Sequence, residues 1–256
     1  MLLGVNIDHI ATLREARKIN EPNPLEAIFV LKNAGASQVT LHLREDRRHI
    51  HDEDFKTIIS QSFLPVNLEC ASSMIDTIAP YFPHRVTLVP EKREEVTTEG
   101  GLDLEQKQVI GAIEKLHKYS IPVSLFINPK VKNIKLAKKL GVQSIELHTG
   151  EWANLFLMAY TNLKHTHNAI STLNLPIKNL EEKMKLSLCE LKECSKLAKD
   201  LGLGVFAGHG LNYQNVTPIA SIPEITELNI GHSIIARSIF VGLFEAVKEM
   251  KELIQR

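Results

Sequence analysis

The sequence has little of several features that mark specialised classes of protein. Three cysteines among 256 residues are too few for a disulfide framework, and the spacing of Cys70, Cys189 and Cys194 does not match a metal-binding knuckle. No uninterrupted apolar stretch approaches the roughly 18 residues that a membrane-spanning helix needs. A disulfide-rich secreted domain and a membrane-spanning protein are therefore not indicated.

The chain also lacks an excess of charge of either sign. Its 30 Lys and Arg residues balance 30 Asp and Glu residues, and the isoelectric point is near 7.2. This balance provides no global field to hold nucleic acid or an anionic membrane surface. The N-terminal MLLGVNIDHI lacks the basic start and small-residue cleavage site of a secretory signal. We therefore expect a cytoplasmic protein whose partners are small molecules, with neither nucleic acid nor membrane among them.

The order of apolar segments is typical of repeated β-α units. Short runs rich in Val, Ile and Leu alternate with helical patterns, which indicates a parallel sheet. The expected strands are 2–8, 38–43, 65–71, 85–90, 122–127, 144–149, 204–209 and 227–232. A length of 256 residues is close to the roughly 250 of one closed eight-fold barrel. The sequence thus predicts an α/β fold, a (β/α)₈ TIM barrel, formed by one domain over residues 1–256.

Two segments depart from this minimal plan. The polar connection 91–103, with paired glycines at 100 and 101, is either a mobile lid over the site or a solvated loop. The stretch 151–185 is longer than a strand-to-helix connection normally needs and holds the only tryptophan, Trp152. We expect this stretch to be an insertion that adds a helix after strand six.

Polar residues recur at the C-terminal ends of the expected strands, where TIM barrels carry their catalytic groups. They are Asn6, Asp8 and His9 on the first strand, His42 and Arg44 on the second, Glu69 on the third, Glu146 and His148 on the sixth, His209 on the seventh, and Asn229 and His232 on the eighth. Burying such groups costs several kcal/mol unless they are paired or solvated. A shared pocket explains all of these positions.

Several of these residues also allow a purely structural interpretation. Asp8 either caps the segment that follows it or contacts a ligand. His148 is more readily a core histidine bonded to a neighbouring carbonyl than a catalytic group. The run REDRR is by default a solvated charge cluster, from which we exempt Arg44 because it lies nearest the strand. Cys70 is interpreted as a small packed residue beside Glu69.

Glycines near the last two strands indicate a phosphate site. AGHG (207–210) and NIGH (229–232) provide flexible backbone where the loops after strands seven and eight commonly hold phosphate. A helix beginning near Ser233 would direct its positive end to the same anion. Arg44, His49 and Thr97 form a second candidate anion site. The sequence therefore predicts two phosphorylated groups.

At this point the motifs resemble a known family. GVNIDHIATLR, LHLREDRRHI, VNLE, VPEKR followed by VTTEGG, IELHTG, AGHGL and LNIGH resemble the pyridoxine 5'-phosphate synthases of vitamin B6 biosynthesis, in the same order from residue 2 to about 240. The resemblance implies condensation of 1-deoxy-D-xylulose 5-phosphate with 3-amino-2-oxopropyl phosphate to pyridoxine 5'-phosphate, phosphate and water. It implies no cofactor and no metal, and it suggests a homo-octamer.

The resemblance also implies roles for individual residues. His42 and Glu69 are expected as proton acceptors, His209 as proton donor and Glu146 as a transition-state stabiliser. The residues expected around the deoxyxylulose phosphate are Asp8, His9, Arg44, His49 and Thr97, and those around the amino ketone phosphate are Asn6, Arg17, Gly210, Gly231 and His232. Two positions depart from the family pattern, because Phe206 stands where we expect Asn and Cys70 where we expect Met.

The chemistry of the residues agrees with these expectations. Imine formation, phosphate elimination and ring closure all move protons, and several groups that titrate near neutrality can serve successive transfers. The many histidines also allow a metal-dependent barrel hydrolase, although no HExxH or comparable compact spacing occurs at a strand end. Another alternative is a catalytically inactive barrel that binds a phosphorylated metabolite or acts as a scaffold. Such a protein would not need His and Glu at the strand ends.

Overall fold

The eight expected strands form a closed parallel barrel. The computed structural model describes residues 1–91 and 100–255. The strands are β1 (Leu2–Asn6), β2 (Gln38–His42), β3 (Val66–Cys70), β4 (Arg85–Leu88), β5 (Val123–Ile127), β6 (Ser144–His148), β7 (Gly204–Gly208) and β8 (Glu227–Ile230). Each strand pairs in parallel with its neighbours, and β8 closes the barrel onto β1. The prediction of a TIM barrel is confirmed.

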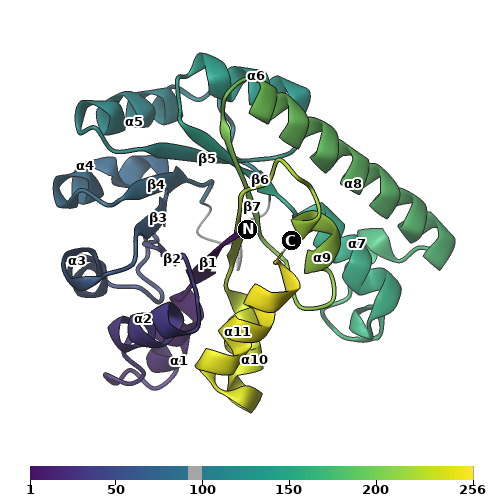
Figure 1. The fold of residues 1–256 in the computed structure, drawn as a ribbon, viewed down its shortest axis with the longest axis horizontal. Helices are drawn as coiled ribbons and strands as arrows, with labels where there is room; N and C mark the ends of the chain where they lie inside the picture. Colours follow the sequence, from purple (N-terminus) through teal and green to yellow (C-terminus); the bar gives the residue numbers. More distant parts are fainter. Residues whose placement is uncertain (92–99, 256) are drawn as a thin grey trace.

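The helices lie around the outside of the strands (Figure 1). They are α1 (Asp8–Glu15), α2 (Pro24–Asn33), α3 (Asp52–Gln61), α4 (Ile75–Ile78), α5 (Lys107–Lys118), α6 (Val131–Lys139), α7 (Gly150–Tyr160), α8 (Ile177–Asp200), α9 (Val216–Ala220), α10 (His232–Val241) and α11 (Leu243–Leu253). The extra helix expected after strand six is α7, which packs against α8. Among the described residues, no helix is long and apolar enough to cross a membrane.

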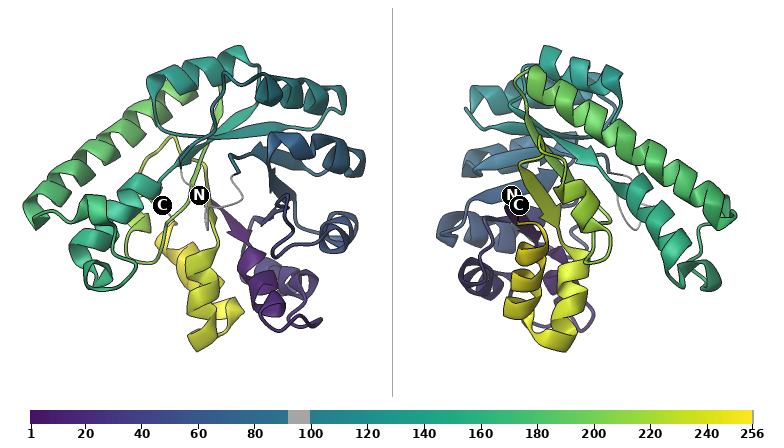
Figure 2. Two further views of the ribbon diagram at one scale, coloured as in Figure 1. Left: turned by 180° about the vertical axis from the view of Figure 1, so that it is seen from behind. Right: turned by 45° about the vertical axis from the view of Figure 1, so that its right-hand side comes forward.

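Several boundaries differ from the sequence prediction. The segment before β7 is one helix of 24 residues, α8, which lies along one side of the molecule in Figure 2. The last helical pattern breaks into α10 and α11 at Gly242, whose φ of 83° lies in the left-handed region that glycine tolerates and that ends a helix. In the connection between β3 and β4, α4 is a single turn between two short 3₁₀ turns, because Pro80 has no N–H to donate.

The two faces of the strands differ in chemistry. Leu3, Val5 and Leu41 alternate with polar residues and pack outward with the helices in the hydrophobic core. The polar residues face the barrel axis, because the Arg85 guanidinium on β4 donates to both carboxylate oxygens of Glu227 on β8, a strand across the barrel. The apolar core therefore lies between strands and helices, while the interior of the barrel is polar.

Candidate active site

Asp8 is tied to the second strand rather than to its own helix. One carboxylate oxygen accepts the backbone N–H of His42 at 2.9 Å, and the other accepts the side-chain amide of Asn6 at 2.8 Å. These bonds place the Asp8 carboxylate beside His42, and its contact with a ligand stays a prediction.

Asp8, His42 and Glu69 meet at the C-terminal end of the barrel. His42 and Glu69 are paired neighbours in the β2–β3 register. One ligand atom from each of the three residues lies within 4.8 Å of the other two, so among the described residues this is the group that could hold a metal ion. Burial raises the pKa of Glu69 well above its usual value, and the carboxylates of Glu146 and Asp8 raise it further.

Glu91 belongs to the same cluster, although the sequence analysis did not select it. One of its carboxylate oxygens lies 3.5 Å from His42 Nε2, and the other lies 3.5 Å from Arg44 Nε. The second oxygen also accepts the backbone N–H of Glu45 at 3.0 Å. Burial raises the pKa of Glu91, but hydrogen bonding and the charges of His42 and Arg44 outweigh burial and leave it lowered. The feature of the sequence that could have indicated Glu91 is its position in VPEKR, directly after an expected strand.

Arg44 and His49 border this cluster. Arg44 is buried, and the rings of His42 and His49 lie 6.4 Å apart between centroids. The loop that carries His49 is held by Arg14, which donates to the His49 carbonyl at 2.9 Å and makes two bonds of 2.7 Å to Asp54. The bidentate pair therefore ties this loop and the start of α3 to α1.

Two expected substrate contacts stay outside the observed cluster. Thr97 and most of the 91–103 connection lie outside the described residues. The interpretation of this connection as a lid therefore stays a prediction. Arg17 is exposed in the turn after α1, and in the described part of the chain no contact ties its guanidinium to the other site residues.

Glu146 occupies the interior of the barrel, below the strand ends. One carboxylate oxygen accepts the side-chain amide of Asn229 at 2.7 Å. Burial, followed by the nearby Glu227 carboxylate, raises the pKa of Glu146 to about 7. A Cβ at Gly208 would lie 2.2 Å from the other oxygen, so only glycine leaves room for this side chain. Glu146 can therefore exist both with and without its proton near neutrality.

His209 follows β7 in a constrained backbone conformation. Its φ is 79°, and the Thr149 hydroxyl lies 2.7 Å from its carbonyl oxygen. Burial lowers the pKa of the His209 imidazole. The His148 ring lies beside it, with centroids 4.9 Å apart. The interpretation of His148 as a core histidine is incomplete, since its polar partner is the side-chain amide of Asn128, at 3.3 Å, rather than a backbone carbonyl.

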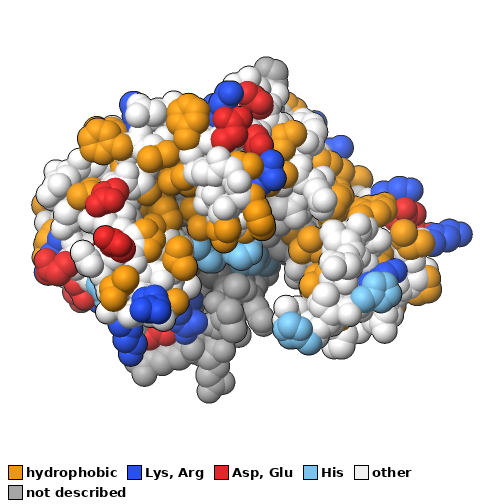
Figure 3. Space-filling view, turned by 90° about the horizontal axis from the view of Figure 1, so that it is seen from below, with side chains coloured by type: hydrophobic (Ala, Val, Ile, Leu, Met, Phe, Trp, Pro, Cys, Tyr) orange, Lys and Arg blue, Asp and Glu red, His pale blue; other side chains and the backbone are white. Residues whose placement is uncertain are grey.

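Gly231, His232 and His9 lie together where an anion is expected. A Cβ at Gly231 would lie 2.8 Å from Asn6 Cβ, so β8 approaches β1 closely there. His232 begins α10, whose first turn leaves N–H groups without helical acceptors. The His9 and His232 rings meet edge to face at 4.9 Å. Gly210, also expected in this region, has a φ of 79° and is exposed. Figure 3 shows histidine side chains gathered in a hollow of one face of the molecule.

The two departures from the family pattern have local explanations. The Phe206 ring faces the barrel axis, and the Arg85 guanidinium lies 4.3 Å from its centroid, as in a cation–π contact. Cys70 is fully buried, and burial raises the pKa of its thiol. Both residues support the packing around the site, as was expected for Cys70.

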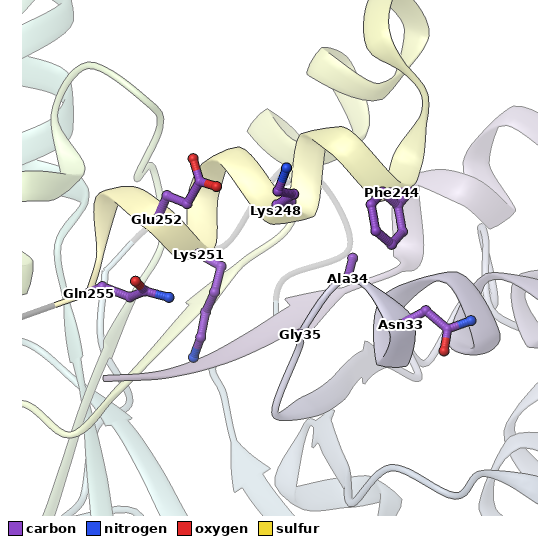
Figure 4. Close-up of a pocket in the computed structure, with 8 residues that line it drawn as sticks. All are labelled: Asn33, Ala34, Gly35, Phe244, Lys248, Lys251, Glu252 and Gln255. Carbon is purple, nitrogen blue, oxygen red and sulfur yellow. The ribbon is translucent and has the colours of Figure 1, made fainter.

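A surface groove of about 420 Å³ lies between α2 and α11 (Figure 4). It is at the opposite end of the barrel, because Lys251 in its lining donates to the carbonyl of Met1, which precedes β1. Its other charged side chains, Lys248 and Glu252, are exposed on α11. In TIM barrels the chemistry lies at the strand C-termini. The groove is therefore not the candidate active site.

Comparison with known proteins connects this geometry to a family. The family model described as pyridoxal phosphate biosynthesis protein PdxJ matches residues 3–256. The chain is 60% identical to the pyridoxine 5'-phosphate synthase of Aliarcobacter butzleri, over 100% of this chain and 99% of the relative. It is 57% identical to that of Wolinella succinogenes, over 100% and 99%, and 56% identical to that of Helicobacter hepaticus, over 98% and 97%.

Solved structures of other barrels share only the fold with this chain. Phosphoribosyl anthranilate isomerase from Thermus thermophilus aligns with a TM-score of 0.57 at 12% identity, over 99% of this chain and 98% of the other. A 3-hexulose-6-phosphate synthase aligns with a TM-score of 0.56 at 13% identity, over 100% of both chains. At such identities the fold is shared and the chemistry must be argued from the site.

Proposed function

The chain belongs to the PdxJ family of pyridoxal phosphate biosynthesis proteins and has pyridoxine 5'-phosphate synthase activity, and we propose that the polar strand ends described above carry out this synthesis. The substrates are 1-deoxy-D-xylulose 5-phosphate and 3-amino-2-oxopropyl phosphate. The observation that carries the proposal is the meeting of Asp8, His42 and Glu69 within 4.8 Å, with the Glu146 carboxylate near enough to raise the pKa of Glu69.

The reaction needs several proton transfers. The substrate amine adds to the ketone, and the carbinolamine loses water to give an imine. Inorganic phosphate is then eliminated, and an aldol-type closure with loss of a second water gives the aromatic ring. Each transfer gains from a positioned acid or base whose pKa lies near the working pH. Holding both substrates in one site also replaces an unfavourable bimolecular encounter.

His42 and Glu69 are the proton acceptors in this proposal. The raised pKa of Glu69 makes its carboxylate a stronger base once it has lost its proton. His42 is backed by Asp8, which accepts its backbone N–H and so fixes the strand end that carries the ring. Two bases on neighbouring strands can serve successive steps without rearrangement of the barrel.

His209 and Glu146 act from the other side of the barrel. Because burial lowers the pKa of His209, its imidazolium form gives up a proton readily. Glu146, with a pKa of about 7 and a hydrogen bond from Asn229, stabilises positive charge when ionised and donates a hydrogen bond when neutral. These properties suit a proton donor and a transition-state stabiliser.

The two phosphate groups bind in adjoining parts of the barrel mouth, since Asn6 of one set donates to Asp8 of the other at 2.8 Å. Arg44 and His49, together with Asp8, His9 and Thr97, hold the deoxyxylulose phosphate, and the guanidinium fork matches a phosphate. Asn6, Gly210, Gly231 and His232, together with Arg17, hold the amino ketone phosphate at the positive end of α10. The close approach of Gly231 to Asn6 supports this second set.

Incubation of the purified protein with both substrates tests the function directly. Pyridoxine 5'-phosphate and inorganic phosphate should appear together in equal amounts. Omission of either substrate should abolish both products. If neither substrate is consumed while circular dichroism shows a folded protein, the proposed reaction is wrong.

We further propose a homo-oligomer, for which the family resemblance suggests an octamer. Large apolar side chains are exposed on two helices that contact each other: Leu13 on α1 is 60% exposed, and Ile239 and Phe240 on α10 are 76% and 83% exposed. Contiguous exposed apolar residues of this size commonly mark protein interfaces. Sedimentation should give an assembly of eight chains, and Phe240→Glu should reduce its size, whereas a monomeric wild-type protein would contradict the proposal.

A cytoplasmic location completes the proposal. Cys70, Cys189 and Cys194 are all free thiols, and two of them are buried. Free cysteines persist in reducing compartments. Fractionation of cells expressing the natural protein should place it with the cytoplasmic enzymes.

A further inference from the structure

We propose that His148 is an additional substrate-contacting residue, whose Nε2 accepts a hydrogen bond from the amino group of the amino ketone phosphate. The proposal rests on the function proposed above and assigns to this site the group that recognises the substrate nitrogen. The sequence alone favours a core role for His148, whereas the surroundings of its ring favour a contact with substrate.

The ring nitrogens of His148 have fixed and different roles. The Asn128 side-chain oxygen accepts the backbone N–H of Gly101 at 3.0 Å, and because an N–H can only donate, the Asn128 atom that faces it must be the oxygen. The same oxygen lies 3.3 Å from His148 Nδ1. Nδ1 must therefore carry the ring proton. Nε2 is left with a lone pair and is a hydrogen-bond acceptor.

This Nε2 acceptor has no protein partner in the described part of the chain, although the atom itself is buried. An unpaired buried acceptor costs free energy and commonly marks a functional role. Gly150 packs closely against this edge of the ring, since a Cβ there would lie only 2.5 Å from Nε2. A donor that arrives with the substrate explains the missing partner of Nε2.

His148 also lies close to the residues proposed to carry out the chemistry. It follows Glu146 on the inward face of β6, and its ring centroid lies 5.0 Å from that of Phe126 and 4.9 Å from that of His209. The proposed proton donor and the proposed amine acceptor are therefore neighbours. A substrate that His209 reaches is also within the surroundings of His148.

The charge state of His148 suits an acceptor and not a base. Burial, followed by the proximity of His209, lowers the pKa of His148 to about 3. At neutral pH the ring stays uncharged and takes no proton from the substrate. A neutral amine that donates one N–H to Nε2 keeps its own lone pair for attack on the ketone, so the contact orients the nucleophile without consuming it.

Two substitutions separate this contact from the packing of the ring. His148→Gln places an amide group near the position of Nε2, whereas His148→Asn keeps a polar group near Nδ1 and removes the one at Nε2. In the full-length protein, His148→Asn should lower kcat/KM for 3-amino-2-oxopropyl phosphate about ten- to a hundredfold. His148→Gln should recover a large part of this loss. The Kd for deoxyxylulose phosphate should stay within about twofold in both variants.

Unchanged kcat/KM in His148→Asn would overturn the proposal. Equal losses in the Asn and Gln variants would also overturn it, because they would indicate that ring packing alone matters.

Calorimetry provides a measurement that does not depend on turnover. The wild-type protein should bind 3-amino-2-oxopropyl phosphate more tightly than hydroxyacetone phosphate, which lacks the amine. His148→Asn should weaken binding of the amine and leave binding of the analogue unchanged, whereas equal weakening of both ligands would refute the contact. If the wild-type protein binds the amine in this way but forms no product, the proposed reaction fails and the His148 contact stands.

Discussion

The Thr149 hydroxyl lies 2.7 Å from the carbonyl oxygen of His209. It also lies 2.7 Å from the carbonyl oxygen of Gly208, which in addition accepts the Thr149 backbone N–H at 2.9 Å. His209 has a φ of 79°, a conformation that costs a residue with a side chain about 1 kcal/mol or more. Thr149, at the end of β6, therefore holds the proposed proton donor in a backbone conformation that His209 does not favour.

Removal of this hydroxyl should affect the chemical step more than binding. We expect Thr149→Val to lower kcat about tenfold while KM changes less than threefold, because His209 is then free to leave its reactive position. Thr149→Ser keeps the hydroxyl and should retain most of the activity. Steady-state kinetics of the two variants decide the point, and equal activity of Val and Ser would show that Thr149 does not position His209.

Glu69→Gln should abolish turnover and leave binding largely unchanged. The amide keeps the shape of the side chain but accepts no proton, so a loss of kcat of about 10²- to 10⁴-fold is expected for an essential base. Glu53→Gln, at an exposed position on α3, is the matched control. Single-turnover kinetics and ligand titration measure the two effects separately. Near-normal turnover in Glu69→Gln would show that another group is the base.

Arg44→Lys should weaken binding of deoxyxylulose phosphate. A compact ammonium replaces a planar fork that makes two parallel bonds to phosphate, so Kd should rise about tenfold or more. The control is Arg48→Lys, since Arg48 is exposed and pairs with Asp46. Calorimetric titration with this substrate alone gives the two constants. An unchanged Kd in Arg44→Lys would place the phosphate elsewhere.

Glu146 should make stability fall as the pH rises. Its pKa is raised from 4.5 to about 7 by burial, so between these values the folded state keeps a proton that the unfolded state has released. The free energy of unfolding therefore decreases by roughly 2–4 kcal/mol as the pH rises through this window.

Glu146→Gln should raise Tm relative to wild type at pH 8 and not at pH 4.5. The exposed Glu114→Gln on α5 should show no such difference, and a pH-independent effect of Glu146→Gln would contradict the argument.

Treatment with a chelator should leave synthesis of pyridoxine 5'-phosphate unchanged. Asp8, His42 and Glu69 are close enough for a metal ion, but both Asp8 oxygens already accept hydrogen bonds, and burial favours the protonated form of Glu69. A metal requires deprotonated ligands. Elemental analysis of the purified protein provides the measurement, and stoichiometric tightly bound zinc together with chelator-sensitive turnover would favour a metal-dependent reaction.

The sequence allowed the barrel and much of the candidate site to be predicted, for a simple physical reason. Strand alternation places side chains on one of two faces, so a polar residue such as His42, Glu69 or Glu146 in an apolar strand must face the barrel axis. Parallel strands then bring their C-terminal ends to one edge of the barrel. These inferences need only local periodicity and connection order.

The features that could not be predicted from the sequence are set by the path of the backbone outside the strands. Glu91 follows Pro90 beyond the end of β4, and no periodicity indicates that its side chain turns back to His42. The helical pattern continues across Gly242, although the backbone there ends one helix and begins another. Likewise, no residue pattern shows that Asn128 fixes the ring proton of His148.

The polar interior of the barrel has a consequence for how this protein can change. The inward residues, among them Arg85, Glu227 and Asn229, are joined by hydrogen bonds across the axis, whereas the apolar residues that hold the helices face outward. Alternate residues of the same strand are therefore constrained differently: the outward residues by packing against the helices, and the inward residues by the polar contacts of the barrel interior. Random substitution of outward positions should yield variants that differ in heat resistance but share one reaction, while libraries confined to inward positions near the strand C-termini should yield altered substrate preference.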